Sequence, residues 1–426
     1  MRRRCLVLLA AVLATVLAVV FTATPAAATG AQPRVVSDRP ASWTPHVLDG
    51  TVYAIAVVGT EVVVGGDFTR VATADRSTTL SRHGLFAFRL GTGEISSSFT
   101  PTPDGTVRAL AAGPDNTVYA GGDFSTVGGA GHRGIAQLAV PSGTPIAAFT
   151  SPGVDGGDVT AVAVHGSALY VGGSFTGVDG TARPALAKLS GTSGALDTNF
   201  NAGLAQQRSG RLRLEKLAIT NDGATLAAAG TFTRAGGADR NQLALLSAAS
   251  GAARNWYTTA YVPDCHAGYN TYLRGVDFAP DGSYLVVVTT GHQAGDKAMC
   301  NSAARFDTGG TGAHDAVWVN RTGGNSLFAV AVTGAAVYVG GHEQWLDNPH
   351  GDKSAGPGAV SRPGIGAIDP TTGKALAWNP TRSRGVGVQS MVTYPAGSGY
   401  PGGLLVGSDT DQLGHEYHGR IGAFPL

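Results

Sequence analysis

The stretch Gly65-Gly66-Asp67-Phe68 decides the fold, because it recurs along the chain. It returns as Gly121-Gly122-Asp123-Phe124 and Gly172-Gly173-Ser174-Phe175, and shorter copies stand at Gly230-Thr231-Phe232, Gly291-His292, Gly340-Gly341-His342 and Gly407-Ser408. Self-similarity of this kind is typical of repeat architectures. The sequence therefore predicts one structural unit that is repeated through the chain.

The third copy is the clearest and indicates what the unit is. Short runs at 160–164, 168–171, 185–189 and 196–201 are separated by segments that contain glycine. Runs of this length, bounded by turn residues, are typical of antiparallel strands. Four antiparallel strands in a repeat make one blade of a β-propeller, so we expect an all-β fold.

Seven glycine marks predict a seven-bladed β-propeller that fills residues 41–426 as a single domain. The last copy reaches Leu426 before a fourth strand. The missing strand is predicted at the N-terminal end, since Trp43-Thr44-Pro45 resembles Trp378-Asn379-Pro380. A strand that completes the last blade would remove an exposed sheet edge. Residues 29–40 are then expected to form a flexible tail.

Residues 1–28 have the pattern of a signal peptide. Arg2 to Arg4 precede an apolar run from Cys5 to Phe21, and Ala26-Ala27-Ala28 supplies small residues for cleavage. We therefore expect cleavage after Ala28 and a secreted, extracellular protein. An uncleaved anchor helix is the alternative, and Arg3-Arg4 leaves a twin-arginine export route open.

The charge of the remaining chain argues against nucleic acid as a partner. Without residues 1–28 it has 27 basic and 29 acidic residues, which gives a net charge of −2. No basic stripe remains, and no second apolar run is long enough to span a membrane. We expect the protein to be a monomer.

Two cysteines follow the predicted leader, Cys265 and Cys300. An even number of cysteines in an exported chain predicts a disulfide. Neither cysteine stands in the paired spacing of a zinc site, so a metal site built on them is the weaker interpretation.

The first four copies place a hydrogen-bond acceptor and a following arginine in the loop after the second strand. A feature that recurs in every unit is typical of groups that build the repeat rather than of a binding site. We interpret the pairs as hydrogen-bonded clasps across each loop: Asp67 with Arg82, Asp123 with Arg133, Ser174 with Arg183, and Thr231 with Arg240.

The last three copies depart from this pattern. The phenylalanine disappears, and the position after glycine becomes His292, His342 or Ser408. The loops of these copies gain polar and aromatic residues, namely Glu343, Trp345, His415, Tyr417 and His418. Departures from a repeated rule mark functional sites, so we expect these side chains to crowd one sector of the face on which the loops open, called here the upper face.

A second candidate site lies at the mouth of the central channel. The first residues of the inner strands are predicted to surround it: Tyr53, Arg108, Thr160, Glu215, Arg274, Phe328 and Gln389. Charged Arg108, Glu215 and Arg274 either grip a polar ligand or neutralise one another, since buried charges need partners in both cases.

The histidines are compatible with a bound metal, but they do not form a pattern that predicts one. Imidazoles with a carboxylate suit zinc or copper, and His342, His415 and His418 are the weak candidates. No cofactor is predicted, because the chain has neither a phosphate-cradling loop nor a dinucleotide fingerprint. It also lacks the Gly-x-Ser-x-Gly elbow of serine hydrolases.

The repeat resembles the delta-60-type repeat of secreted bacterial β-propellers. The resemblance rests on Gly-Gly-Asp-Phe followed by arginine, and on Arg362-Pro363-Gly364, Trp378-Asn379-Pro380 and Gly407-Ser408-Asp409-Thr410. It covers the chain after residue 28 and implies the fold, but no activity. A looser likeness is to kelch-type propellers, which include copper radical oxidases. Those enzymes need a cysteine that is crosslinked to tyrosine. Here both cysteines after the leader are expected to form a disulfide, so neither is left for such a crosslink.

These observations favour a secreted binding or scaffold protein. The expected partner is an extracellular glycan or a cell-surface protein, bound at the upper face of the fifth to seventh repeats. Trp345 and Tyr417 suit stacking on a sugar ring, because an aromatic face combines apolar surface with polar neighbours. The alternative is an enzyme, either a polysaccharide hydrolase or lyase or a metal-dependent oxidoreductase.

Overall fold

The computed structural model describes residues 31–150, 153–266, 268–291, 298–397 and 399–426. The leader predicted over residues 1–28 and the candidate His292 lie outside the described residues. Every regular element within these ranges is a β-strand. A search of the same ranges finds no helix that is long and apolar enough to cross a membrane.

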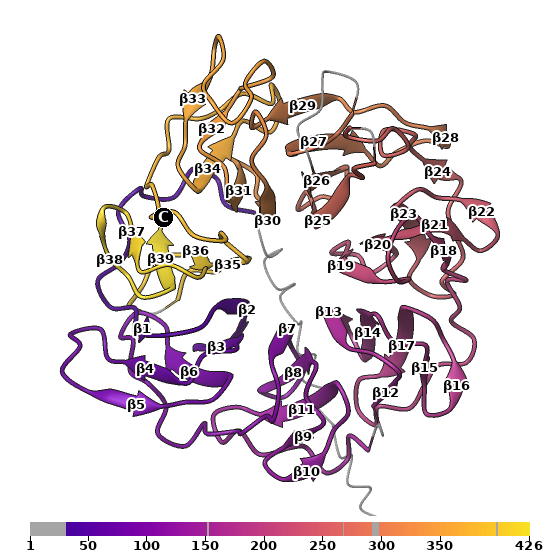
Figure 1. The fold of residues 1–426 in the computed structure, drawn as a ribbon. Coiled ribbons are helices and arrows are strands. Elements are labelled where there is room, and N and C mark those ends of the chain that lie inside the picture. Colours follow the sequence, from indigo (N-terminus) through magenta and orange to yellow (C-terminus); the bar gives the residue numbers. More distant parts are fainter. Residues whose placement is uncertain (1–30, 151–152, 267, 292–297, 398) are drawn as a thin grey trace, which may run out of the picture.

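The larger sheets are antiparallel and pair strands that follow one another closely in the chain, which is the arrangement predicted for blades. Figure 1 shows them placed radially around a central axis in chain order, with the last beside the first. The sheets are β2 (Val52–Val58), β3 (Glu61–Gly66) and β6 (Leu85–Arg89); β7 (Val107–Ala112), β8 (Thr117–Gly122) and β11 (Ile135–Ala139); β13 (Val159–His165), β14 (Ala168–Gly173) and β17 (Leu186–Ser190); β19 (Leu214–Ile219), β20 (Thr225–Gly230) and β23 (Leu243–Ser247); β25 (Tyr272–Phe278), β26 (Tyr284–Thr290), β27 (Ser302–Asp307) and β29 (Trp318–Arg321); β30 (Leu327–Val332), β31 (Val337–Gly341) and β34 (Ile365–Ile368); and β35 (Ser390–Tyr394), β36 (Gly403–Gly407) and β39 (Ile421–Pro425).

Smaller sheets lie farther from the axis (Figure 1). They are built from the loops after the second strands and from the crossovers between repeats. They comprise β1 (His46–Val47), β4 (Arg70–Ala72) and β5 (Thr79–Ser81); β9 (Thr126–Val127) and β10 (Ala130–Gly131); β12 (Val154–Asp155), β15 (Gly177–Val178) and β16 (Thr181–Ala182); β18 (Ala205–Gln207), β21 (Phe232–Ala235) and β22 (Ala238–Asp239); β24 (Trp256–Tyr257) and β28 (Gly312–Ala313); β32 (Trp345–Leu346) and β33 (Val360–Ser361); and β37 (Gln412–Leu413) and β38 (Glu416–Tyr417).

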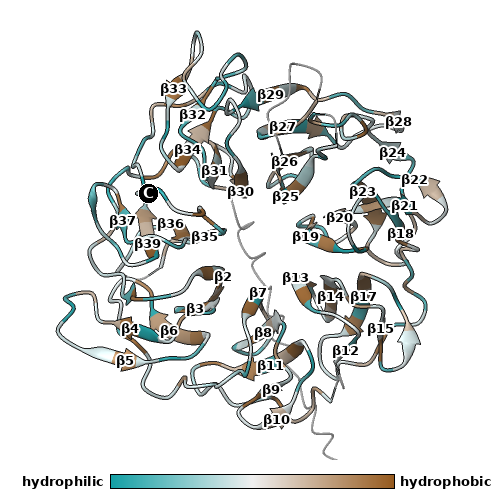
Figure 2. Cartoon of the chain, in the orientation of Figure 1, coloured by the Kyte–Doolittle hydropathy of each residue, from teal (hydrophilic) through white to brown (hydrophobic). Residues whose placement is uncertain are grey.

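The repeated glycines let neighbouring repeats approach each other. A Cβ atom on Gly65 would lie 2.7 Å from Cγ1 of Val107, the first residue of the next inner strand. Hydrophobic side chains fill the space between the sheets, and Figure 2 colours parts of inner strands such as β2 and β7 as hydrophobic. The phenylalanines of the first four marks, Phe68, Phe124, Phe175 and Phe232, are at most 2% exposed. The glycine and phenylalanine positions therefore serve packing between repeats.

The fourth strand of each repeat is shorter than predicted. In the fifth repeat it is a regular strand, β29. In the first four repeats and the sixth it is reduced to isolated bridges such as Phe88 to Ile95 and Leu138 to Pro145. Proline has no N–H group to continue a ladder, which accounts for the short pairing at Pro145.

The N-terminal segment packs on the last repeat. The Ser37 and Ala41 amides donate to the carbonyl oxygens of Pro425 and Ala423, each at 2.7 Å. Nε2 of Gln32 donates to the Gly403 carbonyl at 2.7 Å, and Val36 is 3% exposed. These contacts differ from the flexible tail predicted over residues 29–40, because the open edge of β39 offers carbonyl groups to this segment.

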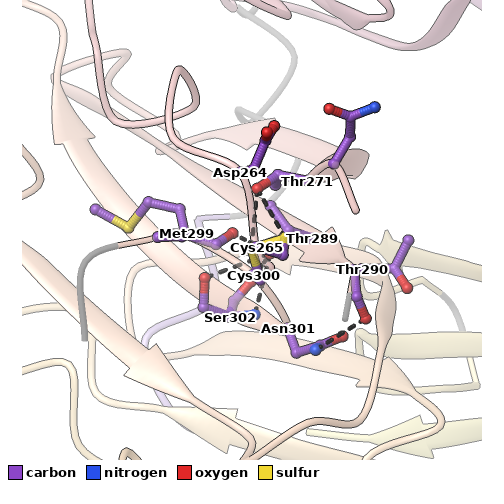
Figure 3. Close-up of a disulfide and its surroundings, with 12 residues drawn as sticks. Asp264, Cys265, Thr271, Thr289, Thr290, Met299, Cys300, Asn301 and Ser302 are labelled. Carbon is purple, nitrogen blue, oxygen red and sulfur yellow. Dashed lines mark hydrogen bonds between the residues drawn. A yellow bond between two sulfur atoms is a disulfide. The ribbon is translucent and has the colours of Figure 1, made fainter. Parts of the chain in front are cut away.

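The predicted disulfide between Cys265 and Cys300 is present, with the two Cα atoms 5.8 Å apart (Figure 3). The Thr271 hydroxyl lies 3.2 Å and 3.0 Å from the two sulfur atoms. Arg208 holds the same crossover, with its guanidinium 2.6 Å from the Asp264 carboxylate. The disulfide therefore fixes the long connection between the fourth and fifth repeats.

Candidate functional site

The mouth of the channel is built by β-bulges. In six inner strands the pairing register with the second strand shifts near the first residue of the inner strand. One residue is skipped in each: Tyr53, Arg108, Thr160, Glu215, Arg274 and Phe328. A bulge leaves one residue unpaired and turns its side chain away from the regular pleat. These six residues and Gln389, just before β35, line one cavity of about 330 Å³. The structure thus brings together all the residues that the sequence assigned to the mouth.

The charges at the mouth form a continuous chain of ion pairs. Arg108 lies 2.9 Å from Asp123 and 3.8 Å from Asp158. Arg213 lies 3.9 Å from Asp158 and 3.3 Å from Glu215. Glu215 is also 3.7 Å from Arg274, which joins two repeats. Three arginines therefore face three carboxylates, and this geometry favours the mutual neutralisation that was one of the two alternatives.

The two halves of each predicted clasp have different partners, which corrects the acceptor–arginine pairing. The Asp67 carboxylate accepts the Thr51 amide at 2.6 Å, and Asp123 accepts the Thr106 amide at 2.5 Å. The Ser174 and Thr231 hydroxyls accept amides in the same place, from Asp158 and Arg213. These acceptors hold the start of the inner strand, because its first amides lie beside the end of the second strand.

The arginines of the clasps hold the outer part of the blade instead. Arg82 donates to the Ser96 carbonyl, Arg183 to those of Thr198 and Phe200, and Arg240 to that of Arg254. Arg133 pairs with Asp155 at 3.1 Å. Both halves are structural, as the sequence indicated, but they act on opposite edges of the repeat.

The sixth repeat replaces the packing phenylalanine with an acid. The carbonyl of Glu343 accepts the Gly364 amide at 2.7 Å, as that of Phe68 accepts the Gly84 amide at 2.9 Å, so the two residues occupy equivalent positions. Glu343 is 2% exposed, and neither carboxyl oxygen has a hydrogen-bond partner among the described residues. Burial raises the pKa of Glu343 to about 8, although the Arg382 charge and nearby backbone amides oppose this. The carboxyl therefore keeps its proton at neutral pH and is a hydrogen-bond donor.

A cavity of about 330 Å³ is lined in part by Glu343, whose carboxyl oxygens are themselves buried. It combines an aromatic wall with side chains that form hydrogen bonds, and its lining includes His342, Glu343, Gln344, Trp345, Ser361 and Arg384. Trp345 and Ser361 come from the paired strands β32 and β33. We call this space the Glu343 pocket. It unites His342, Glu343 and Trp345 of the predicted sector.

Two neighbours orient His342 at the edge of the Glu343 pocket. Its Nδ1 lies 2.5 Å from the Gly385 carbonyl, and its Nε2 lies 3.3 Å from the Arg384 guanidinium. Because a carbonyl only accepts and a guanidinium only donates, the proton of the neutral ring is on Nδ1. This arrangement leaves Nε2 as the acceptor that faces the arginine.

The buried Arg382 accompanies Glu343 at the boundary between the sixth and seventh repeats. It donates to the Gly341 carbonyl at 2.9 Å and to the Thr410 hydroxyl at 2.7 Å, and it lies 3.3 Å from Asp409. The backbone of Arg382 forms an isolated β-bridge with Leu413. At the corresponding place in the third repeat, Val154 pairs with Val178. Arg382 thus stands where another repeat has an apolar residue, and its charge is already paired with Asp409.

The remaining predicted residues form a separate cluster at the junction with the N-terminal segment. His418 is 4% exposed and its Nδ1 lies 3.2 Å from the Thr44 hydroxyl. Tyr417 packs against His46 at 4.9 Å between ring centroids, with the Arg76 guanidinium 4.9 Å over its ring. His415 lies 3.3 Å from the Thr381 hydroxyl. The single sector predicted from the sequence is therefore divided into the Glu343 pocket and this junction.

The three histidines proposed as weak metal ligands have these separate partners. A search of the described residues finds no group of three or more His, Cys, Asp or Glu side chains arranged to hold a metal ion.

Several residues of both sites were missed by the sequence analysis. Arg213 and Asp158 complete the ion-pair chain, and Arg382 and Arg384 adjoin Glu343. Lys216, which lines the mouth cavity, was also missed. A column-by-column alignment of the repeats would have found Lys216, because the residue after the mouth position is Ala54, Ala109 and Ala161 in the first three repeats.

The comparison with protein families supports the repeat. A family model described as a domain of unknown function (DUF5122) beta-propeller matches residues 113–145 and 169–200. These stretches contain the second and third strands of two neighbouring repeats, including β8 and β17. No curated protein that was compared with the chain matches it. The match indicates a β-propeller domain, as the sequence predicted.

Proposed function

We propose that the protein is an exported seven-bladed β-propeller that binds an extracellular glycan in the Glu343 pocket. The observation that carries this proposal is the buried, unpartnered Glu343 carboxyl at a position where four other repeats have a packing phenylalanine. A buried polar group without a partner costs about 1–3 kcal/mol in stability. A ligand hydroxyl that accepts its hydrogen bond would remove that cost.

The chemistry of the pocket suits a sugar ring. Trp345 offers an aromatic face, and Glu343, Ser361, Gln344 and Arg384 offer hydrogen-bonding groups around it. Sites of this kind combine an apolar wall with a few polar groups that fix orientation. The cavity of about 330 Å³ is at the small end for ligand pockets, which favours one or two sugar units of a chain end or a side branch.

Export and ring closure are parts of the same proposal. The predicted leader over residues 1–28 supports export, and so does the disulfide between Cys265 and Cys300, since disulfides persist in oxidising compartments. Closure is supported by the hydrogen bonds of Ser37 and Ala41 to β39.

The test is a binding measurement on an array of bacterial and plant oligosaccharides, followed by calorimetric titration with each hit. We expect Trp345→Ala to weaken binding about fivefold or more, since loss of aromatic stacking removes about 1 kcal/mol or more. We expect Glu343→Phe to abolish it, because this change removes the carboxyl that would bind the ligand hydroxyl. Phe124→Leu, a core change in the second repeat, serves as the control and should leave affinity unchanged.

The contradicting result would be a folded Glu343→Phe protein that still binds the glycan with wild-type affinity. Release of reducing ends from the same oligosaccharides would instead favour the hydrolase. In that case the protonated Glu343 would be the acid to test first.

A further inference from the structure

A second departure from the repeat lies inside the central channel, at Lys216. In the strand pairing, the residue that follows each mouth position is small: Ala54, Ala109, Ala161, Gly275 and Ala329, with Ser390 at the corresponding place in β35. Lys216 takes this place in β19, opposite Ala229. One long cationic side chain therefore stands in a ring of small residues.

The channel around Lys216 has a polar entrance and an apolar floor. Lys216 lines both the mouth cavity and a second cavity of about 210 Å³ that continues it inward. All the small residues of its ring line this second cavity. The next residues along the inner strands are apolar and line it too: Ile55, Leu110, Val162, Leu217, Val276, Val330 and Met391. A ligand that enters from the mouth would thus meet the Lys216 amine before the apolar floor.

The mouth contains one cation without an ion-pair partner among the described residues, Lys216. Its arginines are Arg108, Arg213 and Arg274, and their ion-pair partners are Asp123, Asp158 and Glu215. Lys216 takes part in no hydrogen bond or ion pair within the described ranges. Burial lowers the pKa of Lys216; Glu215 opposes this, while Arg274 and Arg213 lower the pKa further. A bound anion would stabilise the charged amine.

We propose that Lys216 binds the carboxylate of a small hydroxylated monoacid, such as a sugar acid, in the central channel. A carboxylate supplies the partner that the Lys216 amine lacks, and a monoanion brings less charge to the apolar part of the channel than a phosphate dianion does. The hydroxyls of such a ligand would lie level with the mouth, where Gln389 offers hydrogen-bonding groups. This site is separate from the Glu343 pocket and does not depend on it.

The test is a calorimetric titration of the full chain after residue 28 with sodium glucuronate, and with glucose as the uncharged counterpart. Glucuronate is expected to bind the wild type, and Lys216→Ala is expected to weaken this binding at least tenfold, because it removes the cation that has no ion-pair partner among the described residues lining the cavity. Alanine is the residue that other repeats use at this position, so the variant is expected to fold. Lys374→Met removes a lysine that is 74% exposed and serves as the matched control, with unchanged affinity.

The pH dependence gives a second readout. Affinity should fall as the pH rises through the lowered pKa of Lys216, since only the charged amine attracts the carboxylate. Lys216→Ala should remove this dependence.

Three results would overturn the proposal. They are equal glucuronate affinity in the wild type and Lys216→Ala, equal affinity for glucose, or absence of wild-type binding to glucuronate, lactate and acetate at millimolar concentration. Glu343→Phe separates the two sites, because it is expected to lose the glycan and to keep glucuronate.

Discussion

Glu343 and Lys216 each replace a residue type that most other repeats share. Glu343 stands where Phe68 and its equivalents pack, and Lys216 stands where Ala54 and its equivalents leave room. Both changes place an ionisable group in a site of low polarity, where the charged form is disfavoured. The two residues therefore carry the functional argument, whereas the repeated positions carry the fold.

The pKa of Glu343 gives a prediction on stability. Its folded-state pKa is raised to about 8, while in the unfolded chain the carboxyl loses its proton near its ordinary value of about 4.5. The folded state thus holds the extra proton between these values, and the stability it contributes is lost as the pH rises through this window. Relative to the wild type, Glu343→Gln should gain stability from pH 5 to pH 8. Urea unfolding at both pH values measures this, and a difference that does not change with pH would show that Glu343 is ionised in the fold.

At the residue scale, the sequence predicted the mouth but misjudged the clasps. The mouth positions follow from the register of the repeat, which can be read along the chain. The hydrogen-bond partners of Asp67 and Arg82 cannot be read along the chain in this way. These partners are backbone groups, and their position depends on how the strands curve. The proximity of Arg382 to Glu343 also escaped prediction, since 39 residues separate them in the chain.

At the scale of elements, the β-bulges are what turn a repeated strand into a site. The bulge in β19 brings both Glu215 and Lys216 to the channel side of one strand, which strict alternation would not allow. The same device recurs in β2, β7, β13, β25 and β30. Sequence alternation alone gives no signal for a bulge, so this feature had to come from the structure.

The contact between β1 and the loop of the last repeat gives a second stability prediction. Burial lowers the pKa of both His46 and His418, whose ring centroids lie 6.0 Å apart. In the unfolded chain each ring takes up a proton as the pH falls below about 6.5, whereas the folded rings take up a proton only at a lower pH. The stability that they contribute is therefore lost as the pH falls from about 6.5.

Urea unfolding at pH 7.5 and pH 5.5 measures this loss. His418→Gln should reduce the dependence on pH, because glutamine has no proton to gain. His83→Gln, at a histidine outside the junction, serves as the control. A His418→Gln protein with the full wild-type loss of stability at pH 5.5 would contradict the structural role given to this junction.

At the scale of the whole molecule, the repeat in the sequence was sufficient to predict an all-β, radial arrangement (Figure 1). It also predicted that an N-terminal strand at Trp43 completes the last repeat; the structure has the hydrogen bond from Ala41 to Ala423 at this place but no regular strand. Trp43 and Trp378 have matching positions, since Ala41 and Leu376 donate to the equivalent carbonyls of Ala423 and Ala367 two residues before each tryptophan. The packing of residues 32–40 was not predicted, because their polar sequence carries no strand pattern.

The contact between the two ends of the chain is what the proposed closed ring depends on, and hydrogen exchange tests it directly. Peptides that contain the Ser37 and Ala41 amides are to be followed by mass spectrometry in the chain after residue 28. A closed ring predicts that these amides exchange as slowly as those of β39, since each donates to its carbonyl groups. Exchange at the rate of an unstructured peptide, while β39 stays protected, would contradict closure by this segment.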